Sequence, residues 1–353
     1  MSLHRITAAD ALARLAGFDT VIDARSEGEF ALDRLPGAVN WPSLHDAERV
    51  TVGTLYKQTS PFEARKLGAA LVARNIAAHI EREVMDKPKG WRPLVYCWRG
   101  GQRSGALSLV LGQIGFQVHI IEGGYKAFRA EMLADLPRLL APLRFQVICG
   151  PTGSGKTRLL QALAGVGAQV LDLEALASHR ASVLGLIPGQ PQPTQKRFDT
   201  LVWQALQALD PARPVFVEAE SKKVGNVTLP ESLIAAMRAS PCLRIDLPFD
   251  ERVALLLEDY PFFVQDPAFF CQRLDTLAEL RGRAVVNGWK EQVQAGQTEA
   301  VVRDLLERHY DPGYERSTRR NFQQFDDART VSLPERGAKA MAQAAARIHA
   351  QFT

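Results

Sequence analysis

The segment Phe145-Gln-Val-Ile-Cys149 leads directly into Gly150-Pro-Thr-Gly-Ser-Gly-Lys-Thr157, and this junction decides the fold. The apolar run predicts a buried strand, and the following run, 158–164, predicts a helix. The loop between them fits the pattern G-x-x-x-x-G-K-[ST], in which glycines let backbone N–H groups converge on phosphate oxygens. We therefore expect a phosphate-binding loop with these contact residues: Gly150, Thr152, Gly153, Ser154, Gly155, Lys156 and Thr157.

Acidic residues follow two other predicted strands in the same half of the chain. Glu218 and Glu220 end the run 215–220, where most phosphate-loop hydrolases carry an aspartate, so the pattern predicts a phosphate site without establishing nucleotide hydrolysis. Asp172 ends another such run, and the carboxyl ends of parallel strands gather at one edge of a sheet. These three acids either support Mg²⁺ beside the phosphates, or they are solvated or helix-capping acids.

Two series of short apolar runs alternate with helical stretches, which indicates an α/β fold with parallel sheets. The first series comprises 20–23, 93–97 and 117–121. The second comprises 144–149, 169–172, 214–218 and 243–246, with a last strand at 330–333 after a mostly helical region. The stretch Leu136-Pro-Arg-Leu-Leu-Ala-Pro142 separates the two series. We predict one domain at 1–136 and a second at 143–353.

Length and composition bound what the protein can do. Its 353 residues fit two domains, and 46% hydrophobic with 23% charged residues is ordinary for a soluble protein. No apolar run is long enough to cross a membrane and no signal peptide is recognisable, so we expect a cytoplasmic protein without membrane contact. The four cysteines are widely spaced, which predicts neither disulfides nor a structural metal site. The net charge of +4 permits a polyanionic partner without requiring one.

A second candidate site is the cysteine at the end of the predicted strand 93–97. Cys97 is followed by Trp98-Arg-Gly-Gly-Gln-Arg103 and then by a helical run. Loop amides, the helix N-terminus and the charges of Arg99 and Arg103 favour the thiolate and raise its reactivity. The pattern predicts Cys97, Arg99 and Arg103 as catalytic residues. The alternative is a cysteine that only fills the core.

The segments around this loop resemble the rhodanese family from about residue 6 to residue 129. They are Asp23-Ala-Arg25 with Glu29-Phe30, Leu35-Pro-Gly-Ala-Val-Asn40, the cysteine loop and Glu122-Gly-Gly-Tyr-Lys-Ala-Phe128. The resemblance implies that Cys97 carries a sulfur or selenium atom. Five residues separate Cys97 from Arg103, however, which is the C-x5-R spacing of tyrosine-type phosphatases. A phosphatase and a transferase with a phosphate-like donor such as selenophosphate both remain open.

The two loops together resemble the tRNA 2-selenouridine synthase family along nearly the whole chain. Further matching segments are Val52-Gly-Thr-Leu-Tyr-Lys-Gln58, Asp172-Leu-Glu-Ala-Leu-Ala-Ser-His-Arg180, Val217-Glu-Ala-Glu-Ser-Lys222 and Tyr310-Asp-Pro-Gly-Tyr314. The resemblance implies a rhodanese-like α/β domain followed by a P-loop NTPase-like parallel-sheet domain with a helical C-terminal part. It also implies a transferase that converts wobble 2-thiouridine (position 34) in tRNA to 2-selenouridine. The implied co-substrates are selenophosphate and geranyl diphosphate, the implied intermediate is S-geranyl-2-thiouridine, and a selenophosphate-supplying enzyme is an implied partner.

Basic residues after the phosphate loop are candidate contacts for the tRNA anticodon loop, although each one can equally belong to a solvated face. The set comprises Arg180, Arg197, Lys222, Lys223, Arg319 and Arg320, accompanied by His179, Lys196 and Arg316. Trp98 or Tyr125 is expected to be available to stack on an exposed base. Four phenylalanines form either a prenyl pocket or part of the core: Phe262, Phe263, Phe269 and Phe270.

Two other functions remain open from the residues alone. One is a C-x5-R phosphatase or a sulfurtransferase with an accessory nucleotide-binding domain. The other is a non-catalytic binding module that a nucleotide regulates through the phosphate loop.

Overall fold

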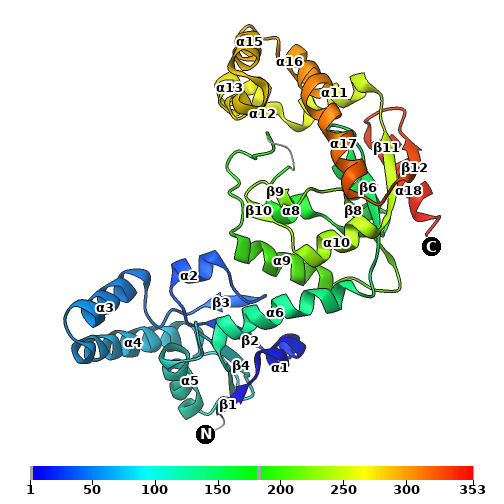
Figure 1. Ribbon diagram of the computed structural model, residues 1–353. Coiled ribbons are helices and arrows are strands. Elements are labelled where there is room, and N and C mark those ends of the chain that lie inside the picture. The colour runs from blue at the N-terminus through cyan, green and yellow to red at the C-terminus, as the bar shows by residue number, and fades with distance from the viewer. Residues whose placement is uncertain (1–2, 181–183, 353) are drawn as a thin grey trace. The chain divides into compact units, whose positions relative to one another are not determined.

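The computed structural model describes residues 3–180 and 184–352 (Figure 1). The chain divides into two compact units, of which unit 1 comprises Met1–Asp135 with Asp199–Gln204. Unit 2 comprises Leu136–Phe198 with Ala205–Thr353. Among the described residues, no helix combines the length and the apolar character that crossing a membrane requires.

Unit 1 contains one parallel sheet, and its strands follow the order β1-β5-β4-β2-β3. The strands are β1 (Leu3–Ile6), β2 (Thr20–Asp23), β3 (Ala38–Asn40), β4 (Pro93–Tyr96) and β5 (Val118–Ile121). The helices are α1 (Ala8–Ala13), the 3-10 turn η1 (Leu15–Gly17), α2 (Glu27–Leu32), α3 (Asp46–Gln58), α4 (Pro61–Glu83), α5 (Gln102–Ile114) and α6 (Gly124–Leu140).

The central strand β4 explains why this sheet could be predicted from sequence. All four of its residues are buried, which is the pattern of a parallel strand that is covered on both faces. On one face, Ile76 of α4 and Leu111 of α5 pack with Trp41 and Trp91 against the sheet. Cys97, directly after β4, belongs to the same cluster. The core of unit 1 therefore reaches the base of the cysteine loop.

Helix α6 runs through the stretch that we expected to separate the domains. Pro137 lies inside the helix, which ends at Leu140. A proline in a helix interior removes one backbone hydrogen bond. Met132, Leu136 and Leu140 are buried along this helix, and their burial offsets that loss. The stretch 136–142 is therefore helical as far as Leu140, and Pro137 does not end the helix.

Unit 2 contains a second parallel sheet, in the order β12-β11-β6-β8-β7, and a short antiparallel hairpin. The sheet strands are β6 (Arg144–Cys149), β7 (Gln169–Leu171), β8 (Pro214–Glu218), β11 (Pro241–Asp246) and β12 (Gln324–Ser332), and the hairpin strands are β9 (Lys223–Val224) and β10 (Val227–Thr228). The helices beside the sheet are α7 (Lys156–Gly165), α8 (Leu173–Ala177), α9 (Gln195–Gln207), α10 (Glu231–Ala239) and α18 (Ala338–His349).

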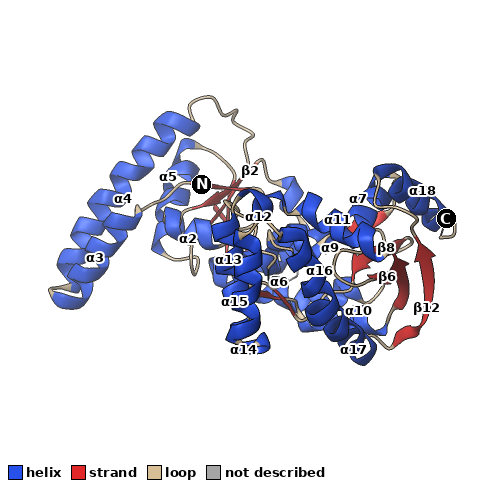
Figure 2. Ribbon diagram, turned by 90° about the horizontal axis from the view of Figure 1, so that it is seen from above, coloured by secondary structure: helices blue, strands red, loops and turns tan. Residues whose placement is uncertain are grey.

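Figure 2 shows α7 and α18 on one side of this sheet and α10 on the other. The α7 and α18 side is a continuous apolar core that includes Leu160 and Ala344 together with Phe216 and Leu243 of the strands. The fold class inferred from the sequence is confirmed, because two parallel sheets with covering helices follow each other along the chain.

A helical part of unit 2 lies between β11 and β12 in sequence. Its helices are α11 (Phe249–Asp259), α12 (Pro261–Gln265), α13 (Pro267–Asp275), α14 (Ala278–Arg281), α15 (Arg283–Gln294), α16 (Thr298–Leu305), the π-helical turn η2 (Leu306–Tyr310) and α17 (Asp311–Asn321). These helices share an apolar core that contains Phe270, Leu274, Trp289 and Val301. The helical C-terminal part expected from the sequence is therefore present.

Candidate functional site

The phosphate loop occupies the turn between β6 and α7, as the sequence predicts. Gly153 and Gly155 have φ angles of +78° and +84°, which residues with a side chain rarely adopt. A Cβ on Gly155 would also lie 2.6 Å from the Cε of Met341. The local backbone therefore requires glycine at both positions.

Lys156 and Thr157 begin α7 and face a cavity of about 900 Å³. The Lys156 ammonium donates to the carbonyl of Gly150 at 2.8 Å. The loop glycines line the same cavity, and the N-terminus of a helix attracts anions. The arrangement can bind phosphate or diphosphate, although the contact residues remain a prediction.

Arg252, a buried arginine that the sequence motifs did not indicate, forms hydrogen bonds to the backbone of the phosphate loop. The Arg252 guanidinium donates to the carbonyl of Thr152 at 2.8 and 3.1 Å and forms an ion pair with Asp311 at 2.6 Å. Nearby, the backbone N–H of Gly150 donates to the hydroxyl of Tyr314 at 2.5 Å. Asp311 and Tyr314 belong to the segment Tyr310-Asp-Pro-Gly-Tyr314, so this segment braces the phosphate loop.

Three carboxylates lie at the carboxyl edge of the sheet. Oxygens of Glu174, Glu218 and Glu220 all lie within 4.8 Å of one another. The hydroxyl of Thr157 donates to Glu174 at 3.2 Å. Asp172 lines the same cavity but caps α8, because its side chain accepts from the N–H of Ala175 at 2.8 Å. Glu174, rather than Asp172, thus joins the two predicted glutamates.

The surroundings of Glu218 disfavour the charged form of its carboxyl group. The residue is 1% exposed, and neither carboxylate oxygen has a hydrogen-bond partner among the described residues. Burial, followed by the charge of Glu174, raises the pKa of Glu218 to about 8, against the opposing charge of Lys156. Burial also raises the pKa of Glu220, with further contributions from Glu174 and Glu218. Carboxylates held this way suit a divalent cation, which would restore their charge balance.

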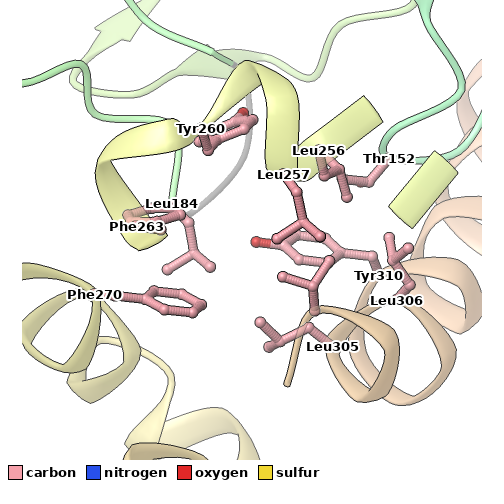
Figure 3. A pocket seen from close by; sticks show the side chains of 11 residues that line it. Thr152, Leu184, Leu256, Leu257, Tyr260, Phe263, Phe270, Leu305, Leu306 and Tyr310 are labelled. Atoms are coloured by element: carbon pink, nitrogen blue, oxygen red, sulfur yellow. The ribbon is translucent and has the colours of Figure 1, made fainter. Parts of the chain in front are cut away.

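An apolar pocket of about 40 Å³ borders the phosphate loop (Figure 3). Thr152, Leu256, Tyr260 and Tyr310 line both this pocket and the larger cavity. Two of the four phenylalanines singled out in the sequence, Phe263 and Phe270, line the pocket. Phe262 and Phe269 instead pack around the helical core as partly buried side chains.

The cysteine loop follows β4 in unit 1. The Cys97 Sγ is nearly buried and accepts hydrogen bonds from the N–H of Gly101 at 3.3 Å and the hydroxyl of Ser104 at 3.1 Å. Gly124 makes the loop possible, since its φ is +57° and a Cβ there would lie 2.3 Å from the Cys97 carbonyl oxygen. Both donors would also stabilise negative charge on a group bound to sulfur.

The two arginines of the loop differ in their surroundings. Arg103 is half-buried and binds both carboxylate oxygens of Glu29, at 2.6 and 3.3 Å. Burial raises the pKa of Glu29, but the hydrogen bonds and charge of Arg103 outweigh it, so this pKa lies below its ordinary value. Arg99 is exposed on the loop. Arg103 is thus fixed in place by Glu29, whereas Arg99 faces solvent.

The candidate tRNA contacts are spread over unit 2, apart from the aromatic pair. Arg180 lines the large cavity with its guanidinium 4.6 Å from the ring centre of Tyr260. Lys222 and Lys223 are exposed, Arg197 is half-buried on α9, and Arg319 pairs with Glu315 and Asp326. Arg320 and Arg316 line a hollow that shares Gly313, Ser317 and Asn321 with the large cavity. The tRNA contacts of these six residues stay a prediction.

The aromatic expectation fails for Tyr125 and stays a prediction for Trp98. Tyr125 is 2% exposed, lies under the guanidinium of Arg25 at 4.1 Å and donates to Asp33 at 2.7 Å. The interpretation of Tyr125 as a base-stacking residue is therefore wrong. Trp98 stacks on Tyr125 with 5.4 Å between ring centres and is only half-buried.

Two family profiles match this chain, one in each predicted domain. The rhodanese-like domain profile matches residues 7–131, and the profile described as tRNA 2-selenouridine synthase AAA domain matches residues 143–277. The chain is thus a two-domain protein with a cysteine-loop domain followed by a phosphate-loop domain. The chain belongs to the tRNA 2-selenouridine synthase family, because curated members of that family match it over most of its length.

Three curated tRNA 2-selenouridine synthases illustrate the likeness. The Nitrosomonas europaea protein is 39% identical over 68% of this chain and 63% of its own length. The Nitrosomonas eutropha protein is 38% identical over 71% of this chain and 66% of its own length. The matched region thus spans slightly less than two thirds of each of these relatives. The Alcanivorax borkumensis protein is 33% identical over 84% of this chain and 88% of its own length.

Replacing Glu218 by glutamine tests the buried carboxylate. Between about pH 5 and pH 8, the folded protein holds a proton on Glu218 that the unfolded chain has lost, so the free energy of unfolding falls as pH rises. We expect Glu218→Gln to flatten this decline, measured by urea denaturation at these two pH values in the presence of a chelator.

The control is Glu231→Gln, which removes an exposed carboxylate from α10. It should leave the pH dependence of wild type unchanged. An identical decline in wild type and Glu218→Gln would show that Glu218 does not hold the proton.

Proposed function

We propose that this chain converts wobble 2-thiouridine in tRNA to 2-selenouridine, with selenophosphate as the selenium source and S-geranyl-2-thiouridine as the intermediate. Membership of the tRNA 2-selenouridine synthase family supports the overall reaction. Geranyl transfer, the first step, is supported by one observation: the apolar pocket adjoins the phosphate-loop cavity, and Thr152 lines both. A ligand with an anionic head and an apolar tail, such as geranyl diphosphate, matches that continuity.

In the first step, the sulfur of 2-thiouridine forms a bond to C1 of the geranyl group. The C1–O bond breaks, diphosphate leaves with the electron pair, and N3 of the base loses its proton. Negative charge grows on the diphosphate, where the loop amides and Lys156 stabilise it more strongly than in the ground state. This chemistry consumes no ATP.

The carboxylate cluster fits a Mg²⁺ ion that accompanies the diphosphate. Glu174, Glu218 and Glu220 supply hard oxygen ligands, and the oxygens of Glu218 have no partner among the described residues. The ion would neutralise charge on the leaving group. The residues themselves orient Thr157 through Glu174 and fix the edge of the cavity.

The second step needs the cysteine loop. Alkylation turns a thiocarbonyl sulfur, which is a poor leaving group, into a thioether-like group that a selenium nucleophile can displace from C2. The Cys97 thiolate attacks the phosphorus of selenophosphate, so the P–Se bond breaks and hydrogen selenide leaves with the electron pair. The selenide attacks C2 of the base and geranyl thiolate leaves, while water hydrolyses the S-phosphocysteine to phosphate and the free thiol. The N–H of Gly101 and the hydroxyl of Ser104 stabilise the charged sulfur of Cys97. A selenophosphate-supplying enzyme is the upstream partner in this proposal.

The direct test is mass spectrometry of nucleosides from a 2-thiouridine-containing tRNA incubated with the protein. Geranyl diphosphate alone should yield S-geranyl-2-thiouridine, and addition of selenophosphate should yield 2-selenouridine. Unchanged 2-thiouridine with folded protein would contradict the proposal. Hydrolysis of an aryl phosphate that Cys97→Ser abolishes would favour the phosphatase instead.

Lys156→Ala should abolish geranyl transfer, because the variant lacks the charge that faces the leaving diphosphate. The readout is S-geranyl-2-thiouridine formed per unit time without ATP. Lys339→Ala removes an exposed lysine from α18 and serves as the control with wild-type activity. Wild-type transfer by Lys156→Ala would rule out this role, and so would strict coupling of the reaction to ATP turnover.

Cys97→Ala should still geranylate tRNA but fail to form 2-selenouridine. Prenyl transfer uses the sulfur of the nucleoside as its nucleophile and needs no protein thiol. The variant should therefore accumulate a late-eluting hydrophobic nucleoside in reversed-phase chromatography. Cys242→Ala, which removes a thiol from unit 2, should complete both steps. If Cys97→Ala makes 2-selenouridine at the wild-type rate, Cys97 takes no part in selenium delivery.

Binding of tRNA should weaken as salt rises, because each phosphate contact shifts log K by about 0.7 to 0.9 per log unit of salt. Arg316→Ala with Arg320→Ala should reduce this slope by about 1.5, since both residues line an open hollow. Arg319→Ala is the matched control on the same helix, because Glu315 and Asp326 already neutralise Arg319. Equal slopes for the double variant and wild type would remove this helix from the tRNA interface.

A further inference from the structure

The apolar pocket beside the phosphate loop has an aromatic end, formed by Phe263 and Phe270. Figure 3 shows Thr152 and Phe270 on opposite sides of the pocket, with Leu256, Leu257 and Tyr310 between them. Thr152, Leu256, Tyr260 and Tyr310 line both the pocket and the phosphate-loop cavity, whereas Phe263 and Phe270 line the pocket alone. Phe270 therefore lies at the end away from the phosphate site.

The aromatic end consists of two stacked rings, those of Phe263 and Phe270. The ring centres of Phe263 and Phe270 lie 4.4 Å apart, with 19° between the ring planes. Phe270 is 1% exposed and packs into the helical core that contains Leu274 and Trp289. A buried ring that is held on one side by another ring and on the other by a packed core yields little when a ligand presses on it.

The wall beside this end is built from α16. Val302 and Leu305 line the pocket, and both are nearly buried. The pocket of about 40 Å³ has room for only the end of a hydrocarbon chain, whereas the cavity of about 900 Å³ receives the rest. A chain anchored by its diphosphate in the loop would meet the Phe263–Phe270 pair if it enters this pocket.

We infer that Phe270, stacked on Phe263, sets the maximum length of the prenyl chain that the phosphate-loop site accepts. The inference rests on the proposed function, because it takes a prenyl diphosphate as the ligand. The diphosphate fixes one end of the ligand, so each added isoprene unit must extend toward the stacked rings. A chain that already reaches the stacked rings could extend further only by displacing Phe270 from a close-packed core.

Phe270→Ala should enlarge the aromatic end of the pocket, so that the site accepts a longer prenyl chain. We expect the ratio of kcat/KM for farnesyl diphosphate to kcat/KM for geranyl diphosphate to rise at least about tenfold over wild type, which is the effect that a few methylene groups have in an apolar pocket. The assay uses the full-length protein, 2-thiouridine-containing tRNA and no selenophosphate. Phe269→Ala is the matched control, because Phe269 lies on the same helix and in the same aromatic cluster but does not line the pocket.

Val302→Phe tests the inference in the opposite direction. This substitution fills the pocket, so the preference should shift from geranyl diphosphate toward dimethylallyl diphosphate by a similar factor. Thermal unfolding identifies variants that fold. If Phe270→Ala does not fold, Phe270→Leu and Val302→Phe decide the outcome.

The failure of this inference differs from the failure of the proposed function. If wild type transfers geranyl but Phe270→Ala and Val302→Phe, both folded, keep the wild-type ratios, the Phe263–Phe270 pair does not set chain length. If wild type transfers no prenyl group from any of the three diphosphates, the proposed function itself fails.

Discussion

The bond between Arg252 and the carbonyl of Thr152 fixes the phosphate loop against the helical part of unit 2. The same guanidinium pairs with Asp311, and Tyr314 accepts the N–H of Gly150 three residues further along the chain. Both contacts involve backbone groups that the loop itself leaves without partners. These contacts fix the position of the phosphate loop relative to the wall of the apolar pocket. Thr152, Leu256 and Tyr310 line both the pocket and the phosphate-loop cavity. Geranyl transfer, as we propose it, depends on that relation.

The two sites use opposite means to handle charge. At the phosphate loop, burial and then the charge of Glu174 raise the pKa values of Glu218 and Glu220, and a cation would favour their charged forms. At the cysteine loop, an N–H and a hydroxyl converge on sulfur, while Arg103 stays with Glu29. The first site suits a leaving group that gains negative charge, and the second suits a nucleophilic chalcogen.

The features that could be predicted from sequence are those encoded by consecutive residues. The central strand 144–149 and the glycine loop after it are local patterns, and so is the cysteine loop after β4. The edge strands β1 and β3 escaped prediction because most of their residues are not buried, so they form no apolar run. Arg252 also escaped, since its partners lie 100 and 59 residues away in sequence. The burial of Tyr125 likewise depends on Arg25 and Asp33, which no motif around Tyr125 reveals.

The division of the reaction between two sites is the central claim, and a relay between two inactive variants tests it most directly. The tRNA is first incubated with Cys97→Ala and geranyl diphosphate, repurified, and then incubated with Lys156→Ala and selenophosphate. Our account predicts 2-selenouridine after the second incubation, because Lys156→Ala retains the cysteine loop and needs only a geranylated substrate. Neither variant alone should form the product. If S-geranyl-2-thiouridine from the first incubation persists unchanged through the second, with Lys156→Ala folded and binding tRNA, the two steps share one site and the account is wrong.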